Sequence, residues 1–143
     1  MITSFKEYEI DDRPSRIDID QVHAWLTTSY WSPGITLERV RRAFKNTALV
    51  VGVYRGSTQV GVLRVISDKT TFAWIADVWV DEGARGQGIA RAMVRFAQGH
   101  PDYQGLRRWV LATQDAQGVY RECGFELVEN PERWMIFRPE PSL

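Results

Sequence analysis

Residues 74–97 read WIADVWV, then DEGARGQG, then IARAMVRFA, and this stretch decides the fold. Its first seven residues are mostly β-branched or aromatic, which is typical of a strand. After the glycines at 83, 86 and 88, apolar residues recur at helical spacing: Ile89, Ala92, Met93, Phe96 and Ala97. The stretch therefore predicts a strand, a glycine-containing turn and an amphipathic helix. Such a turn lets the backbone approach a ligand, and the unpaired N–H groups of the helix start favour phosphate or another anion.

The length and charge of the chain narrow the classes of protein it can belong to. A chain of 143 residues fits one domain, which we place at residues 1–143. Its 18 basic and 18 acidic residues balance, and no block of like charge indicates a nucleic-acid partner. Residues 1–9 contain no apolar core of the kind that a leader segment needs, and no apolar run reaches membrane length, so we expect no membrane partner and a cytoplasmic location.

Few side chains could hold a metal ion or form a disulfide. Cys123 is the only cysteine, and His23 and His100 are the only histidines. A single cysteine excludes an internal disulfide, and we expect no metal site.

The N-terminal half is predicted to start with one half-exposed strand over residues 5–10, where apolar and charged residues alternate. A helix follows over 18–29, with Asp18 or Asp20 as its N-cap, and a second helix is capped by Thr36. Residues 48–54 and 59–66 are typical of a β-hairpin. In the strand over 71–80 both alternating sets of residues are apolar, Phe72, Trp74, Ala76, Val78 and Val80 on one side and Ala73, Ile75 and Trp79 on the other. Both of its faces should therefore be covered.

The C-terminal half continues with a strand over 106–113, which makes a parallel βαβ unit with the strand and helix before it. A short helix capped by Asp115 should end at Gly124. Residues 125–128 and 134–137 are predicted to close the domain as a hairpin.

Two other phosphate-binding motifs do not fit the glycine turn. A P-loop needs Gly-Lys-Ser or Gly-Lys-Thr, and the chain has Gly88-Ile89-Ala90 instead. A dinucleotide fingerprint needs glycine three places after Gly88, where Arg91 stands. The residues of the turn by themselves leave two interpretations open: an anion cradle of another kind, or a purely structural turn.

Two spaced motifs stand out in the second half of the chain. Val78-Trp79-Val80 leads into Arg85-x-x-Gly88-x-Ala90, and Ala116-x-x-x-Tyr120-x-x-x-Gly124-Phe125 follows later. With the order of predicted elements, they resemble the GNAT family of acetyl-CoA-dependent N-acetyltransferases. The resemblance implies an α/β (α+β) fold with a mixed, mostly antiparallel central sheet, a parallel βαβ unit, splayed fourth and fifth strands, and helices on both faces.

The resemblance also implies where acetyl-CoA binds. In the family, backbone N–H groups of the glycine loop wrap the pyrophosphate, and the pantetheine arm pairs with the exposed edge of the fourth strand. The corresponding positions here are Val78, Trp79 and Val80 on the strand and Arg85, Gly86, Gln87, Gly88, Ile89 and Ala90 in the loop. Thr113 stands where many relatives place an asparagine that hydrogen-bonds the cofactor.

The implied reaction is transfer of an acetyl group to an amine by direct attack through a tetrahedral intermediate. By resemblance, Tyr120 points at the thioester sulfur and the N–H of Val78 or a neighbour holds the oxyanion. We select Asp77 as the base, because desolvation in an apolar strand favours uptake of a proton. The alternative is that Asp77 bonds to nearby backbone at a strand bulge, and Asp68 is a second choice of base.

The acceptor is predicted to be a small-molecule amine. Tyr30, Trp31, Phe72 and Trp74 could line its pocket, with Asp68 and Asp77 attracting a cation. A protein or peptide amine, a different acyl donor, and a coenzyme A binding or sensing module without transfer remain alternatives. A homodimer is possible.

Overall fold

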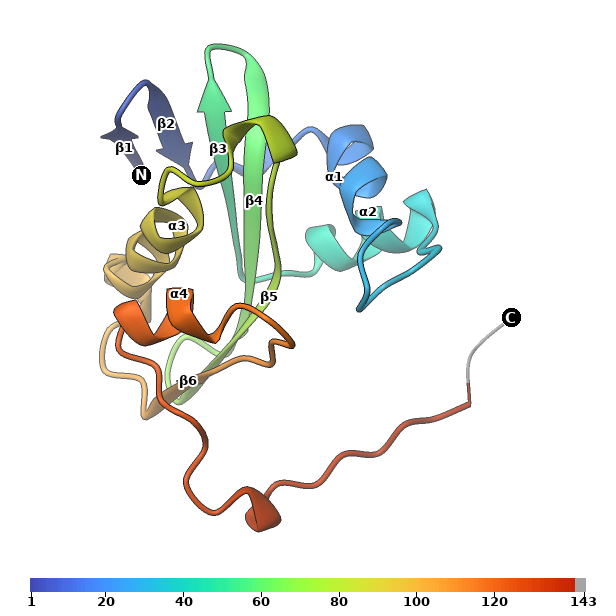
Figure 1. Cartoon of the computed structure of the whole chain (residues 1–143), viewed down its shortest axis with the longest axis vertical. Coiled ribbons are helices and arrows are strands. Elements are labelled where there is room, and N and C mark those ends of the chain that lie inside the picture. The colour runs from blue at the N-terminus through green and yellow to red at the C-terminus, as the bar shows by residue number, and fades with distance from the viewer. Residues whose placement is uncertain (141–143) are drawn as a thin grey trace.

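The computed structural model describes residues 1–140 and contains one six-stranded sheet (Figure 1). Its strands lie side by side in chain order: β1 (Ile2–Phe5), β2 (Tyr8–Asp11), β3 (Leu49–Arg55), β4 (Thr58–Ser67), β5 (Phe72–Val80) and β6 (Arg108–Val110). All neighbours pair antiparallel except β5 and β6, which are parallel. The predicted mixed, mostly antiparallel sheet with one parallel βαβ unit is thus confirmed.

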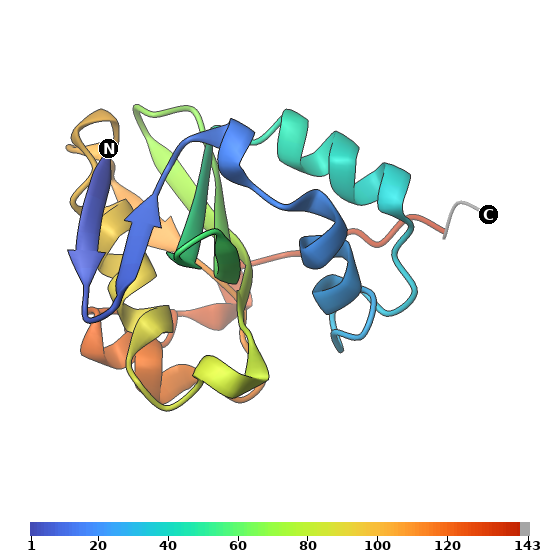
Figure 2. The same ribbon diagram turned by 90° about the horizontal axis from the view of Figure 1, so that it is seen from above.

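Helices cover both faces of this sheet, as predicted (Figures 1 and 2). On one face α1 (Ile19–Leu26) and α2 (Leu37–Lys45) pack their apolar sides on Val50 and Val62. On the other face lie α3 (Ile89–Gln98) and α4 (Gln117–Glu122). No helix within residues 1–140 has both the length and the apolar character that a membrane span requires.

Side-chain caps fix where the first two helices begin. The carboxylate of Asp18 accepts a hydrogen bond from the N–H of Gln21, and the hydroxyl of Thr36 accepts one from Arg39. Of the two candidates for the first cap, Asp18 is therefore the cap. Asp115 does not cap α4: Ala116 is the N-cap and no side chain accepts from the first N–H groups of the helix, while Thr113 Oγ1 accepts from the N–H of Ala116 just before it.

A β-bulge in β5 changes which of its side chains share a face. Arg64 pairs with Ala76 and Val62 with Trp79, so Asp77 and Val78 together oppose Leu63. Asp77 takes the left-handed φ of +54°. The extra residue reverses the alternation, and Val78 and Val80 join Ala73 and Ile75 on the α3 face. The predicted division of the strand, with Val78 and Val80 opposite Ala73 and Ile75, was wrong beyond the bulge.

The predicted single strand over residues 5–10 is instead a hairpin of β1 and β2, with its turn at Lys6 and Glu7. Lys6 supplies the left-handed φ of +54°, a conformation that a sequence normally signals with glycine or asparagine.

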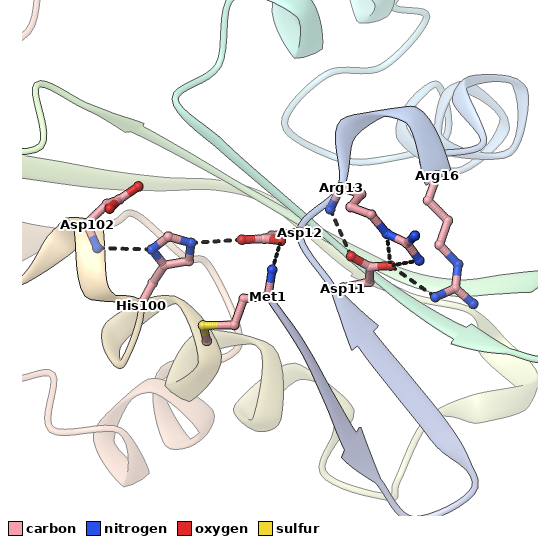
Figure 3. A network of polar contacts seen from close by, with 7 residues as sticks. All are labelled: Met1, Asp11, Asp12, Arg13, Arg16, His100 and Asp102. Atoms are coloured by element: carbon pink, nitrogen blue, oxygen red, sulfur yellow. Dashed lines mark hydrogen bonds and ion pairs between the residues drawn. The ribbon is translucent and has the colours of Figure 1, made fainter.

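Two polar clusters hold this hairpin in place (Figure 3). Asp12 accepts hydrogen bonds from the Met1 amine at 2.7 Å and from His100 Nε2 at 2.8 Å, which ties β1 to the end of α3. Beside it, buried Asp11 accepts from Arg13 and Arg16.

The C-terminal hairpin predicted for 125–128 and 134–137 is absent from the described residues. The strand expected over 106–113 is regular only at Arg108–Val110, and residues 125–140 contain one 3₁₀ turn, Pro131–Arg133, and no strand. After this turn the chain runs extended away from the sheet (Figure 1). A strand needs a neighbouring backbone to pair with, and residues 134–140 pair with no other segment of residues 1–140.

Candidate active site

A cleft opens where β5 and β6 stop pairing. Their ladder contains three residue pairs, from Phe72 with Arg108 to Trp74 with Val110. Beyond these pairs the two strands, the fourth and fifth of the sequence prediction, separate around a cavity of about 490 Å³. Ile75 to Val78 of β5 line one wall, and residues 111–116 with Tyr120 line the other. The splay leaves an edge of β5 without a strand beside it.

The glycine loop borders a second cavity of about 420 Å³ at the other end of this edge. Gly86 and Gly88 take φ values of +81° and +85°, which favour glycine strongly. Gly88 is also the N-cap of α3 and has no capping side chain, so the first N–H groups of this ten-residue helix keep no side-chain acceptor. The loop therefore has the geometry of an anion cradle.

The predicted loop residues divide into those that face the cavity and those that hold the loop. Arg85, Gly86, Gly88, Ile89 and Ala90 line the cavity, although Ile89 is mainly buried and anchors the start of α3. The side-chain amide of Gln87 turns inward. It donates to the Tyr8 hydroxyl at 3.0 Å and to the Ala84 carbonyl at 3.2 Å. Gln87 can therefore offer a ligand only its main chain.

Arg85 covers the end of β5. Its Nε donates to the Val80 carbonyl at 2.9 Å, and its guanidinium lies 5.2 Å from the centre of the Trp79 ring. Val78 lines the cleft and Val80 lines the loop cavity, so the backbone between them connects the two spaces. Trp79 points to the opposite face, toward α1 and α2.

Two charged residues of the loop cavity were not selected from the sequence. Arg91, in the first turn of α3, forms an ion pair with Glu122 at the end of α4, and both line the cavity. Glu122 lies 31 residues away in the chain, and no sequence motif links the two positions.

Tyr120 lies at the base of the cleft, on α4. It is 9 % exposed and packs edge-on against Phe125 at a ring distance of 6.0 Å. Burial raises the pKa of Tyr120 to about 12. Within residues 1–140 the Tyr120 hydroxyl makes no hydrogen bond, and it is not fully enclosed. It can therefore bond to a ligand in the cleft.

Asp77 lines the cleft from the bulge, but it is not the isolated carboxylate that the sequence suggested. Its Oδ2 lies 2.5 Å from Arg64 Nε, and its Oδ1 accepts a hydrogen bond from Trp31 Nε1 at 2.8 Å. Both contacts fix the orientation of the carboxylate at the wall of the cleft. The bulge predicted as an alternative is present, yet the carboxylate bonds to side chains rather than to backbone.

Aromatic side chains gather at the mouth of the cleft as expected. Tyr30, Trp31 and Trp74 all line it, and the Tyr30 hydroxyl accepts a hydrogen bond from the Gln114 N–H on the opposite wall. Trp31 lies edge-on to Tyr30 at 4.9 Å and 6.0 Å from the Trp79 ring. Thr113 lines the cleft too, with its hydroxyl accepting from Ala116.

Asp68 and Phe72 do not reach this cavity. Asp68 lies in the β4–β5 turn, where its carboxylate accepts hydrogen bonds from Thr70, Thr71 and Phe72. The side-chain and backbone bonds from Thr71 hold the pKa of Asp68 well below its usual value. Asp115, which the sequence suggested only as a helix cap, lines the cleft instead.

Comparison with known protein families shows which family has a sequence pattern that matches this chain. The model of the acetyltransferase (GNAT) domain matches residues 46–127, more than half of the chain, and spans the glycine loop and Tyr120. The chain belongs to the GNAT family. It is therefore an acyltransferase, and members of this family generally use acetyl-CoA.

Solved and curated acetyltransferases resemble the chain over most of its length. A Xanthomonas campestris structure described as a GNAT-family acetyltransferase is 37% identical, with a TM-score of 0.88 over 92% of this chain and 93% of that one. A Gibberella zeae protein named as an acetyltransferase is 25% identical over 80% of this chain and 76% of its own. Glucosamine-6-phosphate N-acetyltransferase from Arabidopsis thaliana shares the fold, at 18% identity and a TM-score of 0.67, with 94% and 99% of the two chains covered.

Proposed function

We propose that this GNAT protein transfers the acetyl group of acetyl-CoA to the primary amine of a small molecule. The observation that carries the proposal is the free edge of β5. It begins at the bulge in the cleft, beside Asp77, and ends at Val80 in the loop cavity. One extended ligand lying along this edge would have its anionic end at the glycine loop and its reactive end near Tyr120.

The residues of the loop cavity fit the pyrophosphate of coenzyme A. Gly86 and Gly88 present backbone without side chains, and the α3 N-terminus favours negative charge. Arg85 and Arg91 add two positive charges. Arg91 is shared with Glu122, so a bound phosphate would compete with that carboxylate for the guanidinium. Gln87 would contribute its N–H alone.

In the cleft, the chain would stabilise the charge that develops as an amine attacks the thioester. We propose the N–H of Val78, at the bulge, as the donor to the oxyanion. The Tyr120 hydroxyl would hydrogen-bond to the sulfur. Full proton transfer from a phenol of pKa about 12 to a thiolate of pKa near 8.5 is uphill by about 5 kcal/mol, so hydrogen bonding is the larger part of its role.

Asp77 stays the proposed base, acting directly or through water. An aliphatic amine with a pKa near 10 enters the cleft mostly protonated, and a negative carboxylate would attract it. The carboxylate of Asp77 already bonds to Arg64 and Trp31, so an incoming amine would share it with these two side chains. Asp115 on the opposite wall is the alternative.

The size and lining of the cleft support a small cationic acceptor. Its volume of about 490 Å³ lies in the range of small-molecule sites. Tyr30, Trp31 and Trp74 present aromatic surface, and Asp77 and Asp115 supply negative charge. A cytoplasmic location and a homodimer remain predictions from the sequence.

The test is a panel of amines incubated with acetyl-CoA, read as release of free thiol. Polyamines, aromatic amines, amino sugars and lysine peptides separate the acceptor classes, and propionyl-CoA and succinyl-CoA test the acyl donor. We expect thiol release with at least one small amine and little with peptides. Turnover confined to peptides would overturn the small-molecule assignment. Binding of acetyl-CoA without thiol release across the panel would favour a coenzyme A binding module.

A further inference from the structure

Residues 134–137 form an apolar segment that the rest of residues 1–140 leaves largely uncovered. Met135 is 96 % exposed, Ile136 71 % and Phe137 86 %. Together with Trp134 they form four consecutive apolar residues, a pattern typical of a strand covered on both faces. The segment is extended and runs away from the sheet after the turn at Pro131–Arg133 (Figure 1).

A slot of matching character lies beside β6. Its volume is about 270 Å³, and it runs between two stretches of non-helical backbone, residues 109–113 and 125–128. Consecutive residues of both stretches line it, together with Gln117, Tyr120 and Arg121 of α4. Tyr120 and Phe125 supply apolar surface. β6 is the last strand of the sheet, and its outer edge has no strand partner among the described residues.

We propose that residues 134–138 of one copy insert as a strand into the slot of a second copy, and that the exchange is reciprocal. Such a swap gives a closed, two-fold symmetric dimer. It would pair the free backbone edge by strand addition and cover the exposed apolar side chains. Eight large side chains burying on the order of 150 Å² each would remove roughly 1,200 Å² from water, which reaches the size of a specific interface.

The path of the chain favours a second copy over the segment's own slot. Arg108, at the start of β6, places its guanidinium 5.9 Å from the Trp134 ring and holds the base of the segment. Beyond this contact the chain continues outward (Figure 1). To reach its own slot it would have to reverse around residues 129–133, where the chain forms a 3₁₀ turn led by Asn130 at a φ of +57° and continues extended.

The inserted strand would also close the back of the active site. Tyr120 and residues 111–113 line both the slot and the cleft. A strand from the partner would therefore pack behind the wall that carries Tyr120.

The first experiment measures mass in solution by light scattering coupled to gel filtration. We expect a dimer for the wild-type chain at micromolar concentrations and a monomer for Ile136→Asp. Because Ile136 makes little contact within its subunit, the variant should keep its circular dichroism spectrum. A monomeric wild-type chain would overturn the proposal, as would a dimer that Ile136→Asp leaves intact.

The second experiment locates the segment by cross-linking in a Cys123→Ala background. Val128→Cys and Ile136→Cys chains, one carrying an affinity tag, are co-expressed and treated with a short bismaleimide. We expect tagged–untagged cross-links for this pair and none when Ser57→Cys, in the exposed β3–β4 turn, replaces Ile136→Cys. A chain carrying both Val128→Cys and Ile136→Cys that cross-links only within itself would show a hairpin in its own subunit and refute the swap. Neither readout depends on acetyl transfer.

Discussion

Removal of the Tyr120 hydroxyl separates a role in catalysis from a role in packing. If this hydroxyl hydrogen-bonds to sulfur as negative charge develops there, Tyr120→Phe loses a bond to a charged group, which is worth about 1.5–3 kcal/mol. Turnover should then fall roughly 10- to 150-fold, while KM for acetyl-CoA stays within about twofold. Stability should change by less than about 0.5 kcal/mol, because the hydroxyl makes no hydrogen bond within residues 1–140. Thiol release gives the kinetic constants, and urea unfolding gives the free energy.

The pH dependence sharpens this test. Burial raises the pKa of Tyr120 to about 12, so the residue stays protonated up to about pH 10. The ratio of wild-type to Tyr120→Phe turnover should therefore be constant between pH 7 and pH 10. Tyr103→Phe is the matched control, since Tyr103 is 2 % exposed, its buried hydroxyl also has no partner among the described residues, and it lies outside the cleft. Equal turnover of Tyr120→Phe and Tyr103→Phe would refute the catalytic role.

Three further predictions concern the loop, the base and the N-terminal hairpin. Gly88→Ala should raise KM for acetyl-CoA at least tenfold, because φ at this position is +85° and the new Cβ would lie 2.9 Å from Arg91 Nη2. Gly105→Ala is the control and should leave KM unchanged, because Gly105 also has a left-handed φ but no atom lies within 4 Å of its new Cβ. Asp77→Asn should lower kcat/KM at least tenfold at pH 7, with the deficit shrinking toward pH 10 as the amine loses its proton unaided, and a deficit independent of pH would exclude the base role. Burial opposes the charge of Asp11, but hydrogen bonds from Arg13 and Arg16 outweigh it and lower the pKa to about 2. Since the pKa of an aspartate in the unfolded chain is near 3.9, this carboxylate contributes about 2–3 kcal/mol to the free energy of unfolding above pH 4. That contribution disappears as the pH falls toward 2, and urea titrations of Asp11→Asn should lack this pH-dependent step.

Local signals in the sequence were sufficient to predict most of the helices and strands of the fold. The caps of α1 and α2, the β3–β4 hairpin, the glycine stop after α4 and the strand–turn–helix over residues 74–97 all depend on neighbours within a few positions. Helix caps, apolar spacing and glycine conformations depend on residues that are close together in the chain, so they can be predicted directly from the sequence.

Elsewhere the sequence misled because the deciding contact was distant. Lys6 adopts a left-handed turn conformation while its ammonium donates to the carbonyl of Gln87, 81 residues away. The C-terminal residues have the composition of a hairpin, yet a strand forms only where a backbone edge is available, and composition does not show which edge that is. Asp77 looked isolated, because Arg64 and Trp31 approach it from other elements.

The sequence by itself determined the family, the glycine turn before α3 and the place of Tyr120 on α4, because each rests on residues at fixed spacing. Only the tertiary structure decided how the cleft is assembled. The bulge turns Val78 toward the α3 face, the splay of β5 and β6 opens the cavity, and Arg64 pairs with the carboxylate of Asp77. These features arise where strands meet through backbone pairing and ion pairing, and the residues that meet there are far apart in the chain.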